Sequence, residues 1–260
     1  MSNYFEKKLT YNPITFFISD NPTPTEREIH NYHEILYYVG GKADLLTEEG
    51  QRPLQQNSLL LIPKDTYHFF RSEHRFLRLK IRIPTDFLQA TPFGRLFSRI
   101  AVLDEPDNAV AEAVARLYRI VESEDGERGA FRAYSAFLML LCELDSAPVD
   151  RLSKAELAGN GYVSTLTSII AQNLSGDLSI RTLAEQVGLS PSSVTHTFKK
   201  ELGISLHEYV VQRRLMLAKE KIATGYKPTE IFADCGFQDY SSFYKAYCRF
   251  FGYPPSKEQK

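Results

Sequence analysis

The chain has 260 residues, of which 43% are hydrophobic and 24% are charged, and its formal net charge is −1. This is the composition of a folded protein of about two domains, and its longest apolar runs are too short to cross a bilayer. Three cysteines form no paired framework and the N-terminus has no signal-peptide core, so we expect a cytoplasmic protein with reduced thiols.

Three segments in the first third have the character of β-strands. In RFLRLKIRI (75–83), leucine and isoleucine alternate with arginine and lysine, which is the period-2 pattern of a half-buried strand. EILYYV (34–39) and SLLLIP (58–63) are further strand candidates, separated by turns that contain glycine or proline. Many short strands at such spacing predict a small barrel or sandwich that closes near Pro84, so residues 1–84 are assigned to a β domain.

Helical spacing replaces this alternation after Pro84. Apolar residues recur every three or four residues from Val110 to Val121 and again from Ala133 to Leu141, which predicts two amphipathic helices separated by the polar turn Ser123–Gly129. We expect residues 85–145 to form a helical segment that dimerises or packs against the strand domain. The polar residues 146–162 are predicted to be a linker before a helical domain at 163–260.

The C-terminal part of the chain is the more basic part. Residues 161–260 contain 12 Lys and Arg against 9 Asp and Glu, whereas residues 1–160 contain 19 against 23. Because phosphate binding is largely electrostatic, this small asymmetry is consistent with a C-terminal half that faces nucleic acid.

Residues 179–203, SIRTLAEQVGLSPSSVTHTFKKELG, have the pattern of a helix-turn-helix unit. Gly188 falls at the corner, where a positive φ is favoured, and Ser190 with Pro191 form a typical helix start. The second helix, about 190–202, has an apolar stripe on one side and polar or basic side chains on the other. A helix that enters a major groove has this distribution.

The same arrangement returns 48 to 49 residues later, in TEIFADCGFQDYSSFYKAYCRFFG (229–252). Gly236 takes the place of Gly188, and the second helix of this copy spans about 239–251. Chance produces two copies of a complete helix-turn-helix pattern in one sequence much less readily than it produces a single copy. The sequence therefore predicts an all-α domain that binds DNA.

This pattern resembles the C-terminal DNA-binding domain of the AraC/XylS family of bacterial transcription regulators. The residues that carry it, within about 163–257, are LAEQVGLSPSSVTHTFKKELG, RRLMLAKEKI and CGFQDYSSFYKAYCRFFGYPP. The resemblance implies seven helices, two of which are recognition helices that enter successive major grooves. It also implies a regulator, most often an activator. Its expected partners are double-stranded promoter DNA, a small-molecule effector, RNA polymerase and a second copy of the chain.

The resemblance also implies positions for DNA contacts. Base contacts fall on Ser192, Thr195 and His196 in the first unit and on Tyr240, Ser241, Tyr244 and Lys245 in the second. Phosphate contacts are expected from Lys199, Lys200, Arg249 and Arg214, the last of which matches a family arginine. An ordinary solvated helix face remains an alternative for Thr195 and His196, and Tyr240 and Tyr244 could instead cover neighbouring side chains.

Three features depart from the family pattern. Phe232 stands where the family usually has a small alanine, so the local packing must adapt. Glu258-Gln259 replaces an aromatic residue and an arginine after Pro255, which is expected to remove a structural anchor. The first recognition helix has small polar groups instead of arginine, so bidentate readout of guanine is not expected there.

The first third resembles the cupin-like effector domain that precedes this module in many family members. EILYYVGG and NSLLLIPKDTYHFF carry that resemblance. Glu34 takes the glutamate position of the first cupin motif and His68 the histidine of the second, while His30 fits the second histidine of an H-x-H pair and Glu28 replaces the first. The implied fold class is α+β and multidomain, with an N-terminal cupin-like β-barrel, a helical dimerisation segment, and a C-terminal all-α domain with two helix-turn-helix units.

Strand phase selects much the same residues without the family. In an extended strand the side chains of Glu28, His30, Tyr32, Glu34 and Tyr38 lie on one face, and that of His33 lies on the other. The expected effector site consists of the residues on the first face together with His68. These groups could line a small-molecule pocket, hold a divalent transition metal, or form a structural His–Glu pair.

The preferred hypothesis is a ligand-responsive regulator, and we assign no catalytic residue, metal or cofactor to it. The sequence has no phosphate-cradling glycine loop, no G-x-S-x-G and no HExxH motif. A cupin-type metalloenzyme fused to a DNA-binding tail is the rival hypothesis.

Overall fold

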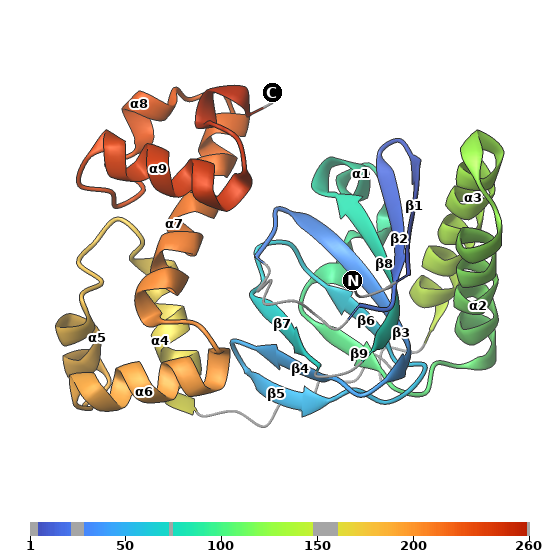
Figure 1. Ribbon diagram of the computed structural model, residues 1–260, viewed down its shortest axis with the longest axis horizontal. Helices are drawn as coiled ribbons and strands as arrows, with labels where there is room; N and C mark the ends of the chain where they lie inside the picture. The colour runs from blue at the N-terminus through green and yellow to red at the C-terminus, as the bar shows by residue number, and fades with distance from the viewer. Residues whose placement is uncertain (1–4, 22–28, 73–74, 148–160, 259–260) are drawn as a thin grey trace. The chain divides into compact units, whose positions relative to one another are not determined.

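The structure is a computed structural model that describes residues 5–21, 29–72, 75–147 and 161–258. The chain divides into an N-terminal unit, Met1–Leu45 with Arg52–Leu157, and a C-terminal unit, Ala158–Lys260 with the short segment Leu46–Gln51. The predicted fold class is confirmed, since a sheet-rich N-terminal domain precedes a helical C-terminal domain (Figure 1).

The described strands form two sheets, and the larger sheet is antiparallel. The larger sheet has the order β1-β2-β8-β3-β6-β9 and the smaller the order β5-β4-β7. The bounds in the larger sheet are β1 (Glu6–Tyr11), β2 (Ile14–Ser19), β8 (Phe76–Pro84), β3 (Tyr32–Gly41), β6 (Leu59–Ile62) and β9 (Ala101–Leu103). Those in the smaller sheet are β5 (Gly50–Pro53), β4 (Asp44–Thr47) and β7 (His68–Arg71). The three predicted strands are β3, β6 and β8, while β9 joins the sheet beyond Pro84.

Strand β3 separates two apolar clusters. Ile35 belongs to the cluster that the larger sheet shares with the helices, whereas Leu36 belongs to the cluster formed with β4 and β7 of the smaller sheet. This division follows from the alternation of side chains along an extended strand. The pleat therefore turns one face of β3 toward the helices and the other toward the space between the sheets.

Helices cover the outer face of the larger sheet. They are α1 (Thr85–Gln89), a 3₁₀ turn at Pro92–Phe97, α2 (Asn108–Ser123) and α3 (Gly126–Ser146). The two predicted amphipathic helices are α2 and α3, and both pack against β1. The predicted turn Ser123–Gly129 is shorter than expected, because the exposed Glu127 and Arg128 form the first turn of α3.

The described part of the C-terminal unit contains only helices and turns apart from its short segment of β4 and β5. Its α-helices are α4 (Gly161–Gln172), α5 (Ile180–Gln186), α6 (Pro191–Leu202), α7 (Leu206–Ala223), α8 (Pro228–Ile231) and α9 (Tyr240–Phe251), followed by a 3₁₀ turn at Pro255–Lys257. Within the described ranges, no helix has both the length and the apolar character needed to span a membrane.

The helix-turn-helix duplication is visible in how the second helix of each copy starts and stops. Ser190 caps α6 by accepting a hydrogen bond from Ser193 N, and Asp239 caps α9 by accepting one from Ser242 N. Both helices end at a glycine in the left-handed region, which is Gly203 for α6 and Gly252 for α9. The first helix of the second copy, α8, is a single turn.

Arg214 of α7 links the two copies. Its Nε donates a hydrogen bond to Leu174 O at 2.8 Å, and its Nη2 donates one to Gly176 O at 2.9 Å, so it holds the segment before α5. A Cβ on Gly236, at the corner of the second copy, would lie 2.5 Å from Nε of Arg214 and 2.3 Å from Leu174 O. Gly236 is therefore required both by its φ of +83° and by close packing.

Glu258 contradicts the expectation of a lost C-terminal anchor. Its carboxylate accepts hydrogen bonds from the hydroxyls of Tyr247 and Tyr253 and pairs with Lys219 at 3.4 Å. A glutamate thus ties the end of the described chain to α7 and α9. Phe232, the other departure, is accommodated by an edge-to-face contact with Tyr240 at 5.9 Å between ring centroids.

The two corner glycines offer a matched test of this packing. Gly188 also has a positive φ, +67°, but an added Cβ would meet nothing within 4 Å. We expect Gly188→Ala to lower the free energy of unfolding by about 1–2 kcal/mol through φ strain alone. Gly236→Ala should lower it by about 1–3 kcal/mol more, because overpacking is added. Urea unfolding followed by circular dichroism measures both, and equal losses would contradict the close packing at Gly236.

Candidate functional site

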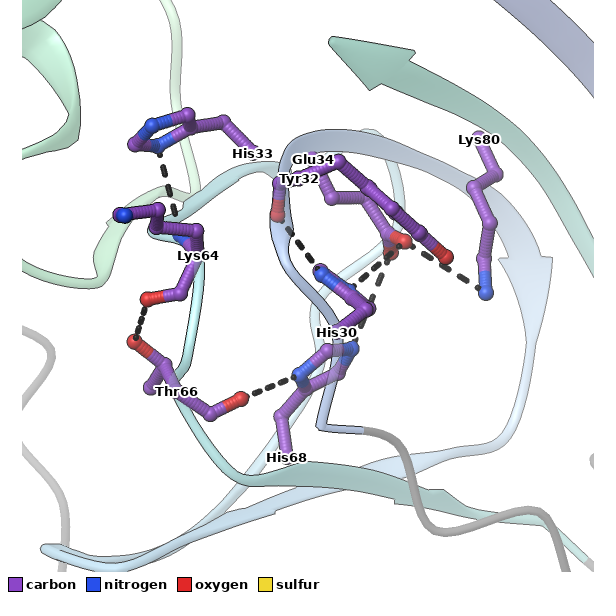
Figure 2. A network of polar contacts seen from close by, with 8 residues as sticks. All are labelled: His30, Tyr32, His33, Glu34, Lys64, Thr66, His68 and Lys80. Atoms are coloured by element: carbon purple, nitrogen blue, oxygen red, sulfur yellow. Dashed lines mark hydrogen bonds and ion pairs between the residues drawn. The ribbon is translucent and has the colours of Figure 1, made fainter. Parts of the chain in front are cut away.

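A buried polar cluster lies inside the N-terminal unit. Glu34 of β3 is fully buried, and it faces His30, which precedes β3, and His68, the first residue of β7 (Figure 2). Nε2 of His30 lies 3.4 Å from Oε2 of Glu34, and Nε2 of His68 lies 3.9 Å from Oε1. Two groups from one segment and a third from a distant part of the chain thus converge in an otherwise apolar interior.

The backbone fixes the orientation of both imidazole rings. Nδ1 of His30 lies 2.7 Å from the carbonyl oxygen of Tyr32, and Nδ1 of His68 lies 3.1 Å from that of Thr66. Because a carbonyl oxygen only accepts hydrogen bonds, Nδ1 carries the proton in both rings and donates it. The ring of Tyr32 also stacks on His30, with centroids 3.8 Å apart and an interplanar angle of 5°.

Lys80 of β8 adds a positive charge to the cluster. Its Nζ lies 3.6 Å from Oε2 of Glu34. Burial alone would raise the pKa of the Glu34 carboxyl, but the charge of Lys80 and the interactions with His30 and His68 outweigh burial and hold that pKa well below its usual range. The carboxyl of Glu34 is therefore ionised.

The structure brings together some of the predicted effector residues and separates others. His30, Glu34 and His68 contact one another, and Tyr32 stacks on His30, whereas Tyr38 packs against Phe76 in the apolar cluster. Glu28 lies outside the described residues.

His33 points away from the cluster, as strand phase predicts. Its Nδ1 accepts a hydrogen bond from Lys64 N at 3.3 Å, and its ring lies against Phe97. Burial, aided by the charge of Lys64, lowers the pKa of His33 to about 4.

Lys80 was not predicted. The alternation in RFLRLKIRI separates its basic face from its apolar face, but it does not reveal that the basic face lies beside Glu34. Arg82 lies directly opposite Glu34 across the strand pair β3–β8, and Lys80 lies opposite Leu36. The available signal for Lys80 was Glu34, an acidic residue in an apolar strand, because a buried carboxylate requires a nearby positive charge.

A second candidate site is the polar face of α6. Ser192, His196, Lys199 and Lys200 are exposed, and Thr195 is partly exposed. With Ile180, Arg181 and Pro191 they line a groove of about 850 Å³. The apolar stripe on the opposite side of this helix is buried.

Helix α9 presents a comparable face. Ser241, Tyr244, Lys245 and Arg249 are exposed, while Phe243 and Tyr247 on the other side are buried. Tyr240 is only partly exposed, because its ring packs against those of its aromatic neighbours on α9 and against Phe232.

Arg214 is placed differently from the exposed basic residues. It is partly buried, and two of its N–H groups donate to backbone carbonyls. The structure thus gives Arg214 a bracing role, while its role as a phosphate contact stays a prediction.

Comparisons with known proteins agree with this organisation. Residues 16–141 match the family model of an AraC-like ligand binding domain, and residues 183–260 match that of a helix-turn-helix domain. The chain belongs to the AraC/XylS family of bacterial transcription regulators. It therefore combines a DNA-binding helix-turn-helix domain with a ligand-binding domain, and its relatives are regulators rather than enzymes.

Several relatives cover most of the chain, and two of them are regulators with the following similarity. The probable transcriptional regulator LumQ of Photobacterium leiognathi is 26% identical over 88% of this chain and 90% of its own length. The Msm operon regulatory protein of Streptococcus mutans is 22% identical over 91% of this chain and 86% of its own length. Among solved structures, ToxT from Vibrio cholerae aligns with 98% of this chain and 97% of its own, at 13% identity and a TM-score of 0.41.

The pairing of Glu34 with Lys80 predicts a strong energetic coupling. Glu34→Leu and Lys80→Met should each destabilise the fold, because each leaves a partner charge in a buried setting. The double variant should lose less stability than the sum of the two, with a coupling of about 0.5–3 kcal/mol in urea unfolding.

An exposed ion pair provides the control for this cycle. Arg71 and Asp44 lie 2.9 Å apart with side chains that are 48% and 38% exposed, so their coupling should stay below about 1 kcal/mol. Additive effects at Glu34 and Lys80 would mean that the two side chains do not stabilise each other.

Proposed function

We propose that this AraC/XylS-family protein is a sequence-specific transcription regulator, and an activator, that is controlled by an effector bound inside the N-terminal unit. The two recognition helices, about 190–202 and 239–251, enter successive major grooves of promoter DNA. The observation that carries the proposal is the duplicated helix-turn-helix, in which α6 and α9 each bury an apolar stripe and expose a polar and basic face.

The exposed side chains divide into two roles. Ser192, Thr195, His196, Tyr240, Ser241, Tyr244 and Lys245 lie on the first two turns of their helices and contact bases. Lys199, Lys200 and Arg249 lie in the last turns and neutralise phosphates, which positions the protein without reading sequence. Arg214 joins this second group through the N–H groups that it does not use on the backbone.

The effector is a small molecule that contacts the polar cluster. Its contacts are with Glu28, His30, Tyr32, Glu34, Tyr38 and His68. The convergence of His30, Glu34 and His68 in an apolar interior supports this proposal, because a few fixed polar groups in an apolar setting orient a ligand. Effector binding shifts the population of DNA-binding conformations, and activation proceeds through RNA polymerase.

The protein acts as a homodimer that associates through α2 and α3. Phe131 and Met139 on α3 are 51% and 57% exposed. A groove of about 370 Å³ lies between the two helices and is lined in part by Ile120, Ala136 and Met139. Large apolar side chains beside a groove are typical of an interaction surface.

Salt dependence tests the DNA-binding proposal. We expect the full-length protein to bind a site selected from a random DNA pool with an affinity that falls steeply as salt rises, because bound phosphates release counterions. Lys199→Ala or Lys200→Ala should weaken binding to all sequences and reduce the slope of log K against log [salt] by about 0.9 each. Fluorescence anisotropy measures the slope, and Lys257→Ala, an exposed lysine outside both helices, is the control.

Substitution of a base-reading residue should have a different signature. His196→Ala or Lys245→Ala should change the preferred base at one position by about 1–3 kcal/mol, which binding to single-base variants of the selected site measures. The function proposed here would be wrong if the full-length protein showed no salt-sensitive binding to any selected DNA.

Substitution on α3 tests the dimer. Met139→Glu should convert the dimer to a monomer in analytical ultracentrifugation while leaving the melting temperature nearly unchanged, because the side chain is already exposed. Tyr226→Glu changes a residue that is 58% exposed in the C-terminal unit and should leave the dimer intact. A Met139→Glu protein that still sedimented as a dimer would exclude this face as the interface.

A further inference from the structure

The arrangement of His30, Glu34 and His68 indicates which class of ligand the polar cluster binds. One nitrogen or oxygen atom from each of the three residues lies within 4.8 Å of the other two, and all three residues are buried. Figure 2 shows the two imidazoles and the carboxylate pointing toward one another, with His30 and Glu34 on one segment of the chain and His68 on another.

The backbone contacts of both rings leave their Nε2 atoms at the centre of this cluster. In both histidines Nδ1 donates to a backbone carbonyl, so Nε2 is the ring atom that faces the carboxylate of Glu34. At that position Nε2 either carries a proton that it donates to the carboxylate or offers a lone pair to a metal ion. The cluster is therefore built to attract a cation, either a proton or a metal ion.

The spacing fits a metal ion. Ligand atoms bound at about 2.1 Å to one ion lie about 3.0–3.4 Å apart when they are neighbours around it. The distance of 3.4 Å from His30 Nε2 to Glu34 Oε2 is already in that range, and the distance of 3.9 Å from His68 Nε2 to Glu34 Oε1 requires only a small approach.

We propose that His30, Glu34 and His68 bind one divalent transition-metal ion through the two Nε2 atoms and the carboxylate of Glu34. Two imidazoles and one carboxylate favour ions such as Zn²⁺, Co²⁺, Ni²⁺ or Fe²⁺ over Mg²⁺ and Ca²⁺, which prefer oxygen ligands. This inference rests on the proposed function and deepens it, because it names the ligand class of the effector site. Three protein ligands leave at least one coordination position for water or for a donor atom of an effector.

The surrounding residues support such a site. The carbonyls of Tyr32 and Thr66 accept the Nδ1 protons, which is the outer-shell contact that orients metal-binding histidines. Lys80 holds the carboxylate from the other side, but its charge opposes a divalent ion. If the cluster binds a cation, removal of Lys80 should strengthen ligand binding. If it binds an anion, removal of Lys80 should weaken ligand binding.

The test uses full-length, tag-free protein stripped with a chelator and then titrated calorimetrically with ZnCl₂. We expect one ion per chain, visible absorption bands when CoCl₂ replaces ZnCl₂, and no binding of MgCl₂. His30→Ala, His68→Ala and Glu34→Gln should each weaken Zn²⁺ binding by more than the roughly 10–100-fold effect that follows loss of an outer-shell partner.

The neighbouring histidine supplies the matched control. His33→Ala removes an imidazole from the opposite face of β3 and should retain stoichiometric Zn²⁺. Lys80→Met should bind Zn²⁺ more tightly than the wild type, and weaker binding there would argue against a cation site. Circular dichroism of the stripped variants checks that each is folded.

The wild-type titration is decisive even if a variant fails to fold. No Zn²⁺ or Co²⁺ binding by the stripped wild type, or binding that His33→Ala abolishes, would overturn the proposal and leave protonation as the source of positive charge. Anisotropy with the selected DNA is measured in parallel with chelator present. DNA binding without metal binding would refute this inference alone, whereas loss of DNA binding under all conditions would refute the proposed function.

Discussion

One fully buried carboxylate, that of Glu34, constrains the interior of the N-terminal unit. An ionised carboxylate is unfavourable away from water unless positive charge or hydrogen-bond donors surround it. The fold brings His30 from the segment before β3, His68 from β7 of the smaller sheet and Lys80 from β8 of the larger sheet. Contacts around a single charged group therefore tie the two sheets together where their apolar packing is interrupted.

The same strand register specifies the apolar core and this cluster. Glu34 lies opposite Arg82, and Ile35 lies opposite Ile81. A slip of one residue would exchange the faces of β3, which would place Glu34 in the apolar cluster beside the helices and Ile35 beside the two histidines. Both misplacements are strongly unfavourable. The strand register that gives a stable apolar core therefore also positions the polar site.

Local periodicity explains which elements the sequence could predict. The strands β3 and β8 and the helices α2, α3, α6 and α9 are long enough to show their pattern, and β6 is a continuous apolar run between turns. Strands β4, β5, β7 and β9 have three or four residues and neither signal, so they were not recognised. Contacts between residues that are distant in sequence could not be predicted without the three-dimensional fold. Strand phase removed His33 from the site, but only sheet pairing shows that Lys80 lies beside Glu34, and only the packing of α9 shows that Glu258 meets two tyrosine hydroxyls.

The chemistry of α6 suggests how recognition is shared between the two helix-turn-helix copies. Hydroxyls and an imidazole offer single hydrogen bonds, which discriminate bases less well than the bidentate contacts of arginine. Thr195 already donates its hydroxyl proton to Pro191 O at 2.9 Å, so under the proposed function it would offer DNA an acceptor and a methyl group. Under that function, site choice depends on combining weak contacts from both copies at a fixed separation. Arg214 maintains that separation, because its guanidinium holds the segment before α5 and packs against Gly236 at the corner before α9.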